Sequence, residues 1–327
     1  MWTIGNYKIN SPVMLAPMAG ITSYGYRHFM SNFGVAISVT EMVSDMGLIY
    51  GNKETKEYVS FPKEKMFTGV QLFGHDPECL KEAAKIALSL NPNIDFFDVN
   101  MGCPVPKVTK TGAGSSLLKN PKLCGDIIRA IKEVTSLPVT AKIRLGFDDS
   151  HINYLEVIEE LEGAGCDMIA IHTRTAKQLY SGKARTEIIK DLQEKMHVPL
   201  VISGDINSLD DAIVAIEITK AKAVMVARGG IGNPFLIKQI IHYYETGERL
   251  PNPSLNEQLE YMLQLADDLI NEKGEAKAMR IYRGIANKFL TGFPNMKQYK
   301  NRLSIELTDR ESLVRIINEI KADFNLN

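Results

Sequence analysis

Short apolar runs alternate with amphipathic stretches through the first 246 residues of the chain. Several of these runs are continuously apolar, which is typical of strands buried on both faces of a sheet. The pattern predicts eight strands, over residues 13–18, 35–42, 67–73, 96–102, 139–144, 168–174, 199–205 and 223–229. Eight strand–helix units favour an α/β fold of the (β/α)8 TIM-barrel type, with an open doubly wound sheet as the alternative.

Helix starts between these strands carry capping signals. A side chain that can cap precedes a proline suited to the first helical position at Asp76 and Pro77, Asn120 and Pro121, and Asn233 and Pro234. Ser208 followed by Asp211 predicts a fourth capped start.

The pattern changes after Thr246. Residues 247–254 have the composition of a linker, and beyond them only helical spacing is found. One helix is expected to end at Gly274, and Thr308 with Glu311 predicts a capping box at the start of another. We therefore expect a barrel over residues 1–246 and a small all-helical domain over residues 247–327.

Composition narrows the class of protein. The 327 residues are 45% hydrophobic and 24% charged, and 38 Lys and Arg meet 39 Asp and Glu. This balance excludes bulk disorder and a generally basic nucleic-acid coat, so any contact with RNA must be a local patch. The chain shows no signal-peptide pattern, no long apolar span and no closely spaced cysteine pair. We expect a cytoplasmic protein with no membrane span, no metal site and no obligatory protein partner.

Polar side chains gather at the predicted ends of the strands. Residues two apart on a strand share a face, which groups Asp98 with Asn100, Lys142 with Arg144, and His172 with Arg174. Gln71 near the end of the third strand joins them. Each residue alone is explained equally well as a solvated strand end. Their repetition favours a ligand site at the barrel mouth, the active face of such barrels.

Glycine-rich segments follow the last two strands. Residues 203–205 close the seventh strand, and residues 227–234 lead from the eighth strand into a helix start. Backbone amides at these loops, together with a helix N-terminus, commonly bind phosphate in barrels. The spacing does not choose between a sugar phosphate and flavin mononucleotide (FMN).

Cys103 directly follows the fourth strand and stands between Gly102 and Pro104. A lone cysteine is more often a packing residue, but a loop at the active face favours chemistry. A thiol with the usual pKa of about 8.5 is mostly protonated at neutral pH and suits a proton donor. A nucleophile is the alternative.

These segments resemble the tRNA-dihydrouridine synthase family, and most closely its bacterial B-type branch. The resemblance covers nearly the whole chain, and its most specific part is the Asn-x-Gly-Cys-Pro motif at residues 100–104. Further matching segments are residues 16–22, 70–74, 107–108, 112–114, 142–144, 171–175 and 204–206.

The resemblance implies an FMN-dependent barrel with a C-terminal tRNA-binding domain. NADPH, or NADH, would reduce the flavin, which passes a hydride to C6 of a uracil in tRNA while Cys103 delivers a proton to C5. The cofactor would be held by Pro17, Met18, Ala19, Gln71, Lys142, His172, Ser203, Gly204, Asp205, Ala227 and Arg228. Asn100 and Arg174 would contact the target base.

A local basic patch in the tail independently favours an RNA partner. Residues 273–302 contain eight Lys and Arg residues and a single acidic residue, Glu275. The eight bases are Lys273, Lys277, Arg280, Arg283, Lys288, Lys297, Lys300 and Arg302. Tyr282, Phe289, Phe293 and Tyr299 lie between them, as on a surface that tracks RNA. The alternative is a solvated helix face with its aromatics in the core. Lys107 and Lys110 are weaker candidates.

Two other functions remain possible at this point. A flavin barrel acting on a free pyrimidine, similar to dihydroorotate dehydrogenase, would need no basic tail, so its turnover should survive deletion of residues 250–327. A non-catalytic RNA-binding barrel should lose nothing when Cys103 is replaced by alanine.

Overall fold

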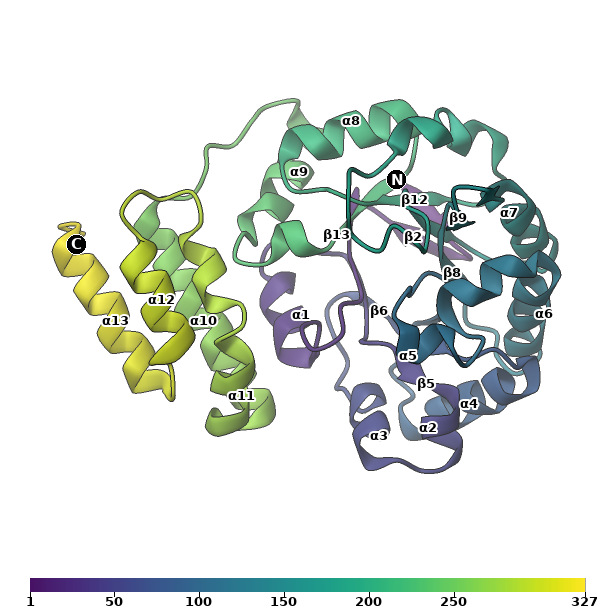
Figure 1. Cartoon of the computed structure of the whole chain (residues 1–327), viewed down its shortest axis with the longest axis horizontal. Helices are drawn as coiled ribbons and strands as arrows, with labels where there is room; N and C mark the ends of the chain where they lie inside the picture. Colours follow the sequence, from purple (N-terminus) through teal and green to yellow (C-terminus); the bar gives the residue numbers. More distant parts are fainter. Residues whose placement is uncertain (327) are drawn as a thin grey trace.

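Eight parallel strands close into a barrel in the computed structural model, which describes residues 1–326 (Figure 1). They are β3 (Val13–Leu15), β4 (Ile37–Val39), β6 (Phe67–Phe73), β7 (Phe96–Asn100), β8 (Val139–Arg144), β11 (Ile169–His172), β12 (Leu200–Ser203) and β13 (Ala223–Val226). Pairing of β4 with both β3 and β6 closes the ring. All eight predicted strands are confirmed, and the open sheet is wrong.

Side-chain alternation along the strands separates two apolar clusters. In β13, Val224 faces the outer cluster that the helices cover, whereas Met225 lies in a second cluster inside the barrel. In β11 the same alternation places Ile171 outside and Ala170 inside. The next inward-facing residue along each strand, two positions further on, therefore lies at the C-terminal mouth of the barrel.

Two short hairpins were not predicted. β1 (Trp2–Ile4) pairs antiparallel with β2 (Tyr7–Ile9), and Trp2 packs with the interior cluster of the barrel. This hairpin adds apolar side chains to the barrel interior. The second hairpin joins β9 (Gly146–Asp148) to β10 (His151–Ile152), and β5 (Val43–Ser44) adds a short pairing to β6.

Helices surround the barrel. The longer ones are α1 (Tyr24–Ser31), α4 (Pro77–Leu90), α6 (Pro121–Lys132), α7 (Tyr154–Gly163), α8 (Leu209–Thr219) and α9 (Phe235–Thr246). Shorter turns lie in the loops: α2 (Asp45–Ile49), α3 (Lys53–Val59), α5 (Pro106–Thr109), η1 (Gly114–Lys119), η2 (Thr186–Ile189), η3 (Leu192–Lys195) and η4 (Arg228–Gly230).

Three of the four predicted caps are present. The side chains of Asp76, Asn120 and Ser208 each accept a hydrogen bond from a first-turn amide. The prediction for Asn233 is wrong, because α9 begins one residue later, with Pro234 in the capping position and no side-chain bond.

The tail is helical, as expected. It contains α10 (Leu255–Lys273), α11 (Glu275–Tyr282), η5 (Ala286–Leu290), α12 (Lys297–Ile305) and α13 (Arg310–Asp323), and Gly274 ends α10. The predicted box of Thr308 and Glu311 is wrong by one residue. Asp309 and Ser312 form the reciprocal pair instead, because the Asp309 carboxylate takes the capping position.

The tail packs against the barrel through α1, which lies on the side facing α10 (Figure 1). Phe29 of α1 meets Phe289 with ring centroids 6.4 Å apart, and Phe33 meets Tyr261 at 5.0 Å. These side chains belong to one continuous apolar cluster. Deleting residues 250–327 would expose part of the barrel's own core, so the expectation that barrel turnover survives this deletion has no structural support.

None of the helices within residues 1–326 combines the length and the apolar content needed to cross a membrane.

Candidate active site

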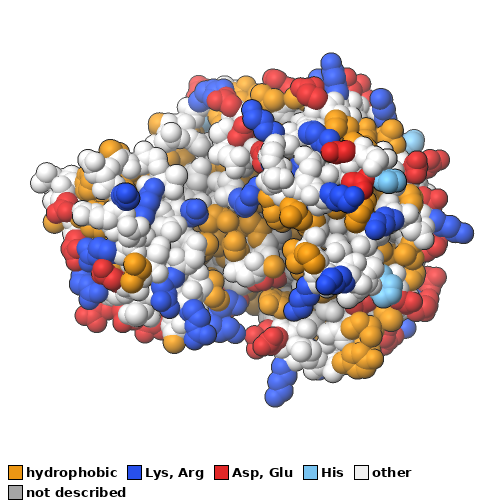
Figure 2. All heavy atoms as spheres, viewed as in Figure 1, with side chains coloured by type: hydrophobic (Ala, Val, Ile, Leu, Met, Phe, Trp, Pro, Cys, Tyr) orange, Lys and Arg blue, Asp and Glu red, His pale blue; other side chains and the backbone are white. Residues whose placement is uncertain are grey.

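A cavity of about 380 Å³ opens at the C-terminal mouth of the barrel. Figure 2 shows a hollow with apolar side chains at the centre of this face. All eleven residues predicted to hold a cofactor line the cavity, and so do Asn100 and Cys103. Its volume lies in the range of small-molecule sites. Arg174 alone among the predicted site residues does not line it.

A chain of hydrogen bonds runs from the barrel interior to the Cys103 loop. Thr140 donates to Asp98 at 2.6 Å, and Gln71 Nε2 donates to the other oxygen of the same carboxylate at 2.6 Å. Asn100 Nδ2 donates to Gln71 Oε1 at 2.8 Å. Asn100 Oδ1 then accepts from the Cys103 amide at 2.8 Å. The side chain of Asn100 therefore fixes the loop that carries the thiol.

Arg144 holds the same loop from the other side. Its Nε donates to the Gly102 carbonyl at 2.8 Å, and its Nη1 donates to the carbonyls of Thr175 and Leu179, each at 2.8 Å. The guanidinium is buried and stays cationic, because Arg does not deprotonate in proteins. Cys103 itself is partly exposed at the cavity wall. The structure thus presents a fixed thiol beside a fixed positive charge.

Lys142 lines the cavity, and the buried carboxyl group of Asp98 interacts with it electrostatically. Burial raises the pKa of Asp98, while hydrogen bonds from Gln71 and Thr140 and the charge of Lys142 act in the opposite direction. Burial and the neighbouring Arg144 lower the pKa of Lys142 to about 8. The ammonium of Lys142 therefore titrates close to physiological pH, and an anion bound in the cavity would favour its charged form.

His172 is held neutral by its surroundings. Burial, followed by the cations Lys142, Arg144 and Arg174, lowers its pKa well below the usual value. Its Nε2 lies 3.2 Å from Nη1 of Arg174, which can only donate. Nε2 is therefore the acceptor, and the hydrogen of the neutral ring is on Nδ1. His172 lines the cavity as an uncharged group.

Arg174 lies behind this wall and is saturated with internal bonds. It is 2% exposed and donates to the carbonyls of Ser181 and Gly182 and to Asp205 Oδ2, the last at 2.7 Å. The predicted contact with a base has no support from this placement. The strand alternation does not extend to Arg174, because β11 ends at His172 and the Arg174 amide turns back to donate to the His172 carbonyl at 2.8 Å. The loop at residues 181–182 then folds over its side chain.

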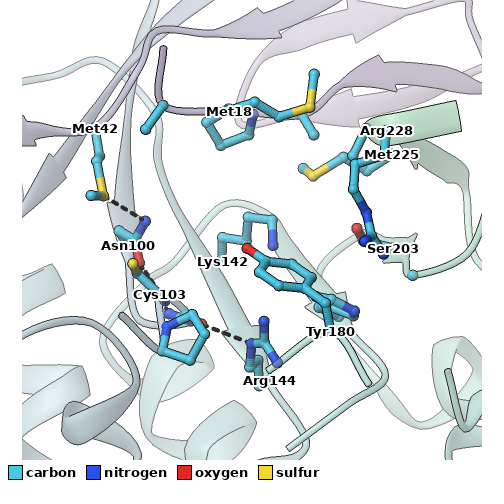
Figure 3. A pocket seen from close by; sticks show the side chains of 18 of the residues that line it. Met18, Met42, Asn100, Cys103, Lys142, Arg144, Tyr180, Ser203, Met225 and Arg228 are labelled. Atoms are coloured by element: carbon cyan, nitrogen blue, oxygen red, sulfur yellow. Dashed lines mark hydrogen bonds between the residues drawn. The ribbon is translucent and has the colours of Figure 1, made fainter. Parts of the chain in front are cut away.

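The opposite end of the cavity has the features of an anion site. Figure 3 shows Ser203 and Arg228 across the cavity from Cys103 and Asn100, with Lys142 between the two ends. The loops after β12 and β13 meet so closely here that a Cβ on Gly229 would lie 2.0 Å from the Ile206 carbonyl oxygen. Only glycine allows this approach. The N-terminus of α9 is not part of the wall, contrary to the sequence-based expectation.

Tyr180 covers part of the cavity and was not predicted. It is 52% exposed, and its ring lies 4.8 Å from the Arg228 guanidinium carbon and 5.5 Å from that of Arg144. Met42 and Met225 add apolar surface to the wall (Figure 3). The alternation of β13 indicates Met225, whereas nothing in the sequence around Tyr180 indicates where its loop folds.

The tail carries exposed bases but no exposed aromatic surface. Figure 2 shows Lys and Arg gathered at the end of the tail where α11 lies. The exposed ones are Lys277, Arg280, Lys288 and Lys297, whereas Arg302 pairs with Glu306 and Glu319 and Lys273 pairs with Glu272. The predicted interleaved aromatics are wrong as an RNA surface. Tyr282, Phe289 and Tyr299 are buried, and Phe293 is partly buried.

The sequence model of the dihydrouridine synthase family matches residues 14–324. The chain belongs to this family. Over 306 residues it is 34% identical to a probable tRNA-dihydrouridine synthase of Rickettsia bellii, and the match covers 93% of each chain. It is 34% identical to tRNA-dihydrouridine synthase B of Shewanella oneidensis, with 86% of each chain covered, and 32% identical to the B enzyme of Pasteurella multocida, with 96% and 94% covered. The family resemblance is confirmed.

Solved structures support the fold alone. A 2-naphthoyl-CoA reductase matches with a TM-score of 0.53 at 12% identity, over 73% of this chain and 51% of that one. Histamine dehydrogenase from Rhizobium sp. 4-9 also has a TM-score of 0.53, at 15% identity, over 75% of this chain and 47% of that one. The chain therefore spans about half the length of these two proteins.

Proposed function

We propose that this protein is an FMN-dependent tRNA-dihydrouridine synthase that reduces uridines in tRNA to 5,6-dihydrouridine with NAD(P)H. Family membership and the fixed Cys103 thiol in the cavity wall carry the proposal. A tRNA substrate would also place the enzyme in the cytoplasm.

The residues that line the cavity support FMN as the cofactor. Residues 17–19 form an apolar wall suited to a flat ring, and the amide of Gln71 and the ammonium of Lys142 can bond to polar ring atoms. Ser203, Gly204 and Arg228 provide a polar end for the ribityl chain and phosphate, with Ala227 beside them. A cationic Lys142 stabilises negative charge on the ring by Coulomb attraction.

Cys103 is the proton donor to the target base. A flavin held by the residues of this cavity, once reduced by NAD(P)H, would supply the hydride for C6 of the uracil. Negative charge then develops toward C5 and the C4 carbonyl, and the Cys103 S–H bond breaks as its proton moves to C5. Arg144 and Asn100 hold the thiol loop in one position, so that no reorganisation is needed at this step. The thiolate is reprotonated from solvent.

The target uridine must leave its base stack to reach this cavity. The exposed cations of the tail, and the exposed Lys107 and Lys110 on the segment after Cys103, can bind the phosphates on either side of this uridine. Electrostatic binding of the backbone requires no aromatic stacking. The buried aromatics of the tail are therefore compatible with an RNA partner.

The test is to incubate the FMN-loaded protein with NADPH and an unmodified tRNA transcript, and to quantify dihydrouridine after digestion to nucleosides. The proposal predicts dihydrouridine in tRNA and none when free uridine is the substrate. Failure of the flavin-loaded protein to form dihydrouridine in any tRNA would contradict it.

A further inference from the structure

The first turn of α1 lacks a capping side chain of its own, and the tail provides one. Ser23 occupies the capping position without an intrahelical side-chain bond, and the first turn contains no acidic residue. Instead, Glu272 of α10 accepts from the Ser23 hydroxyl at 2.6 Å and from the Gly25 amide at 2.8 Å through the same oxygen. A residue 247 positions away in the sequence thus satisfies a helix start.

This carboxylate is held in its ionised form. Burial acts to raise the pKa of Glu272, but hydrogen bonds from Lys273, Ser23 and the Gly25 amide together keep it below the usual value. Its side chain is 18% exposed, and its second oxygen lies 2.8 Å from the Lys273 ammonium. A negative charge at this position also interacts favourably with the dipole of α1.

The two helices are close enough for this contact only because residue 25 is glycine. A Cβ at Gly25 would lie 2.6 Å from the Asp268 carbonyl oxygen and 3.0 Å from Glu272. Any larger residue would push α10 away from α1 and separate the carboxylate from the amide. Glycine at position 25 of the barrel is therefore required for Glu272 of the tail to reach the start of α1.

The segment directly before α1 forms a wall of the cavity. Pro17, Met18, Ala19 and Ile21 line it. The Met18 amide donates to the Thr22 hydroxyl at 2.8 Å, and the Gly20 amide donates to the buried carboxylate of Glu41. The first bond closes residues 17–22 on themselves, and the second ties them to the loop after β4. On the other side they continue into the helix start that Glu272 caps.

We propose that Glu272 is a positioning residue for the cofactor cavity: by capping α1 from the tail, it fixes residues 17–22 against the flavin ring. This inference rests on the proposed function for the identity of the cofactor. It gives the tail a second role beside RNA binding, because Glu272 supports the segment that forms the cavity wall before any RNA is bound.

The test compares Glu272→Ala with wild type in two measurements on the FMN-free protein. Hydrogen exchange of residues 17–25 should become faster, and titration with FMN should give a dissociation constant about threefold to tenfold higher, the range expected for a lost helix cap. Glu272→Gln keeps one acceptor and should show a smaller change. Glu57→Gln is the matched control, because it breaks a different, exposed ion pair between barrel and tail, with Lys277, and should change neither measurement.

A rescue separates capping from general loosening of the tail. In the Glu272→Ala background, Ser23→Asp places a carboxylate at the capping position of α1 itself, where the backbone is already extended. It should restore slow exchange and FMN affinity. Unchanged exchange and affinity in Glu272→Ala, or no rescue by Ser23→Asp, would overturn the inference. Failure of the wild type to bind FMN would sink the proposed function instead, while the exchange measurement would still decide whether Glu272 fixes the wall.

Discussion

The barrel mouth and the helical tail both contain clusters of cations, and they use them in different ways. At the mouth, Lys142 and Arg144 are held by protein on most sides, and their positions are fixed by β8. On the tail, Arg280 on α11 and Lys288 on η5 are exposed to solvent. Charges in a partly desolvated, ordered site act strongly on bound groups, whereas solvated charges act weakly and are screened by salt.

This difference separates chemistry from binding. Substitutions at the mouth should change reduction of the base or retention of the cofactor with little dependence on salt. Substitutions on the tail should change the affinity for tRNA, and the effect should shrink as salt rises. Three experiments test this difference between the two regions.

The largest effect is expected for Cys103→Ala. Loss of the proton donor should slow base reduction about a hundredfold to ten-thousandfold, because a positioned acid contributes that much to such a step. FMN binding and tRNA binding should be unchanged. The rate is measured as dihydrouridine formed per enzyme in a single turnover. Cys79→Ala, which removes another partly exposed thiol, on α4, is the control. Equal rates in the two variants would show that the thiol at the mouth has no chemical role.

A smaller effect is expected when charge is reversed on the tail. Arg280→Glu with Lys288→Glu should weaken tRNA binding about tenfold at moderate salt, and should reduce the slope of log affinity against log salt by about 0.7 to 0.9 per lost phosphate contact. Single-turnover rates at saturating tRNA should stay normal. Arg315→Glu on α13, at the outer edge of the tail, is the control (Figure 1). A slope unchanged by the double variant would exclude this patch from the RNA interface.

The smallest effect is a pH dependence of cofactor binding. Since the pKa of Lys142 is about 8 before FMN binds, its ammonium is present below that pH and lost above it. An anionic ligand favours the charged form, so the FMN dissociation constant should be level below pH 8 and should rise several-fold above it. In Lys142→Met the rise should disappear, while Lys122→Met on the outside of α6 should keep it. A rise that persists in Lys142→Met would assign the titration to another group.

The sequence predicts the barrel well because eight short apolar runs alternate with helical patterns. Within each strand, side chains alternate with a period of two. Gln71, Lys142 and His172 therefore reach the mouth as expected, and a closed ring brings their strand ends together. Arg174 was misplaced because β11 ends at His172, two residues before it, and a neighbouring loop covers its side chain. Tyr180 was missed for a related reason, since only the folded loop brings it over Arg144.

In the tail, composition alone did not predict which side chains are exposed. Bases and aromatics alternate in the sequence, yet a helix separates them onto different faces, so that Tyr282 is buried while Arg280 is exposed. Nothing in the sequence indicated that Glu272 caps α1. The cap depends on two helices meeting at Gly25, and no local pattern predicts a contact between segments so far apart.

The most direct measurement is anaerobic flavin reoxidation in a single turnover. The FMN-loaded protein is bleached with NADPH, freed of excess reductant and mixed with unmodified tRNA, free uridine or orotate, and the return of flavin absorbance is followed. The account predicts rapid reoxidation by tRNA, together with dihydrouridine formation, and no response to uridine or orotate. Reoxidation by a free pyrimidine but not by tRNA would contradict it and would assign the cavity to a small-molecule reductase.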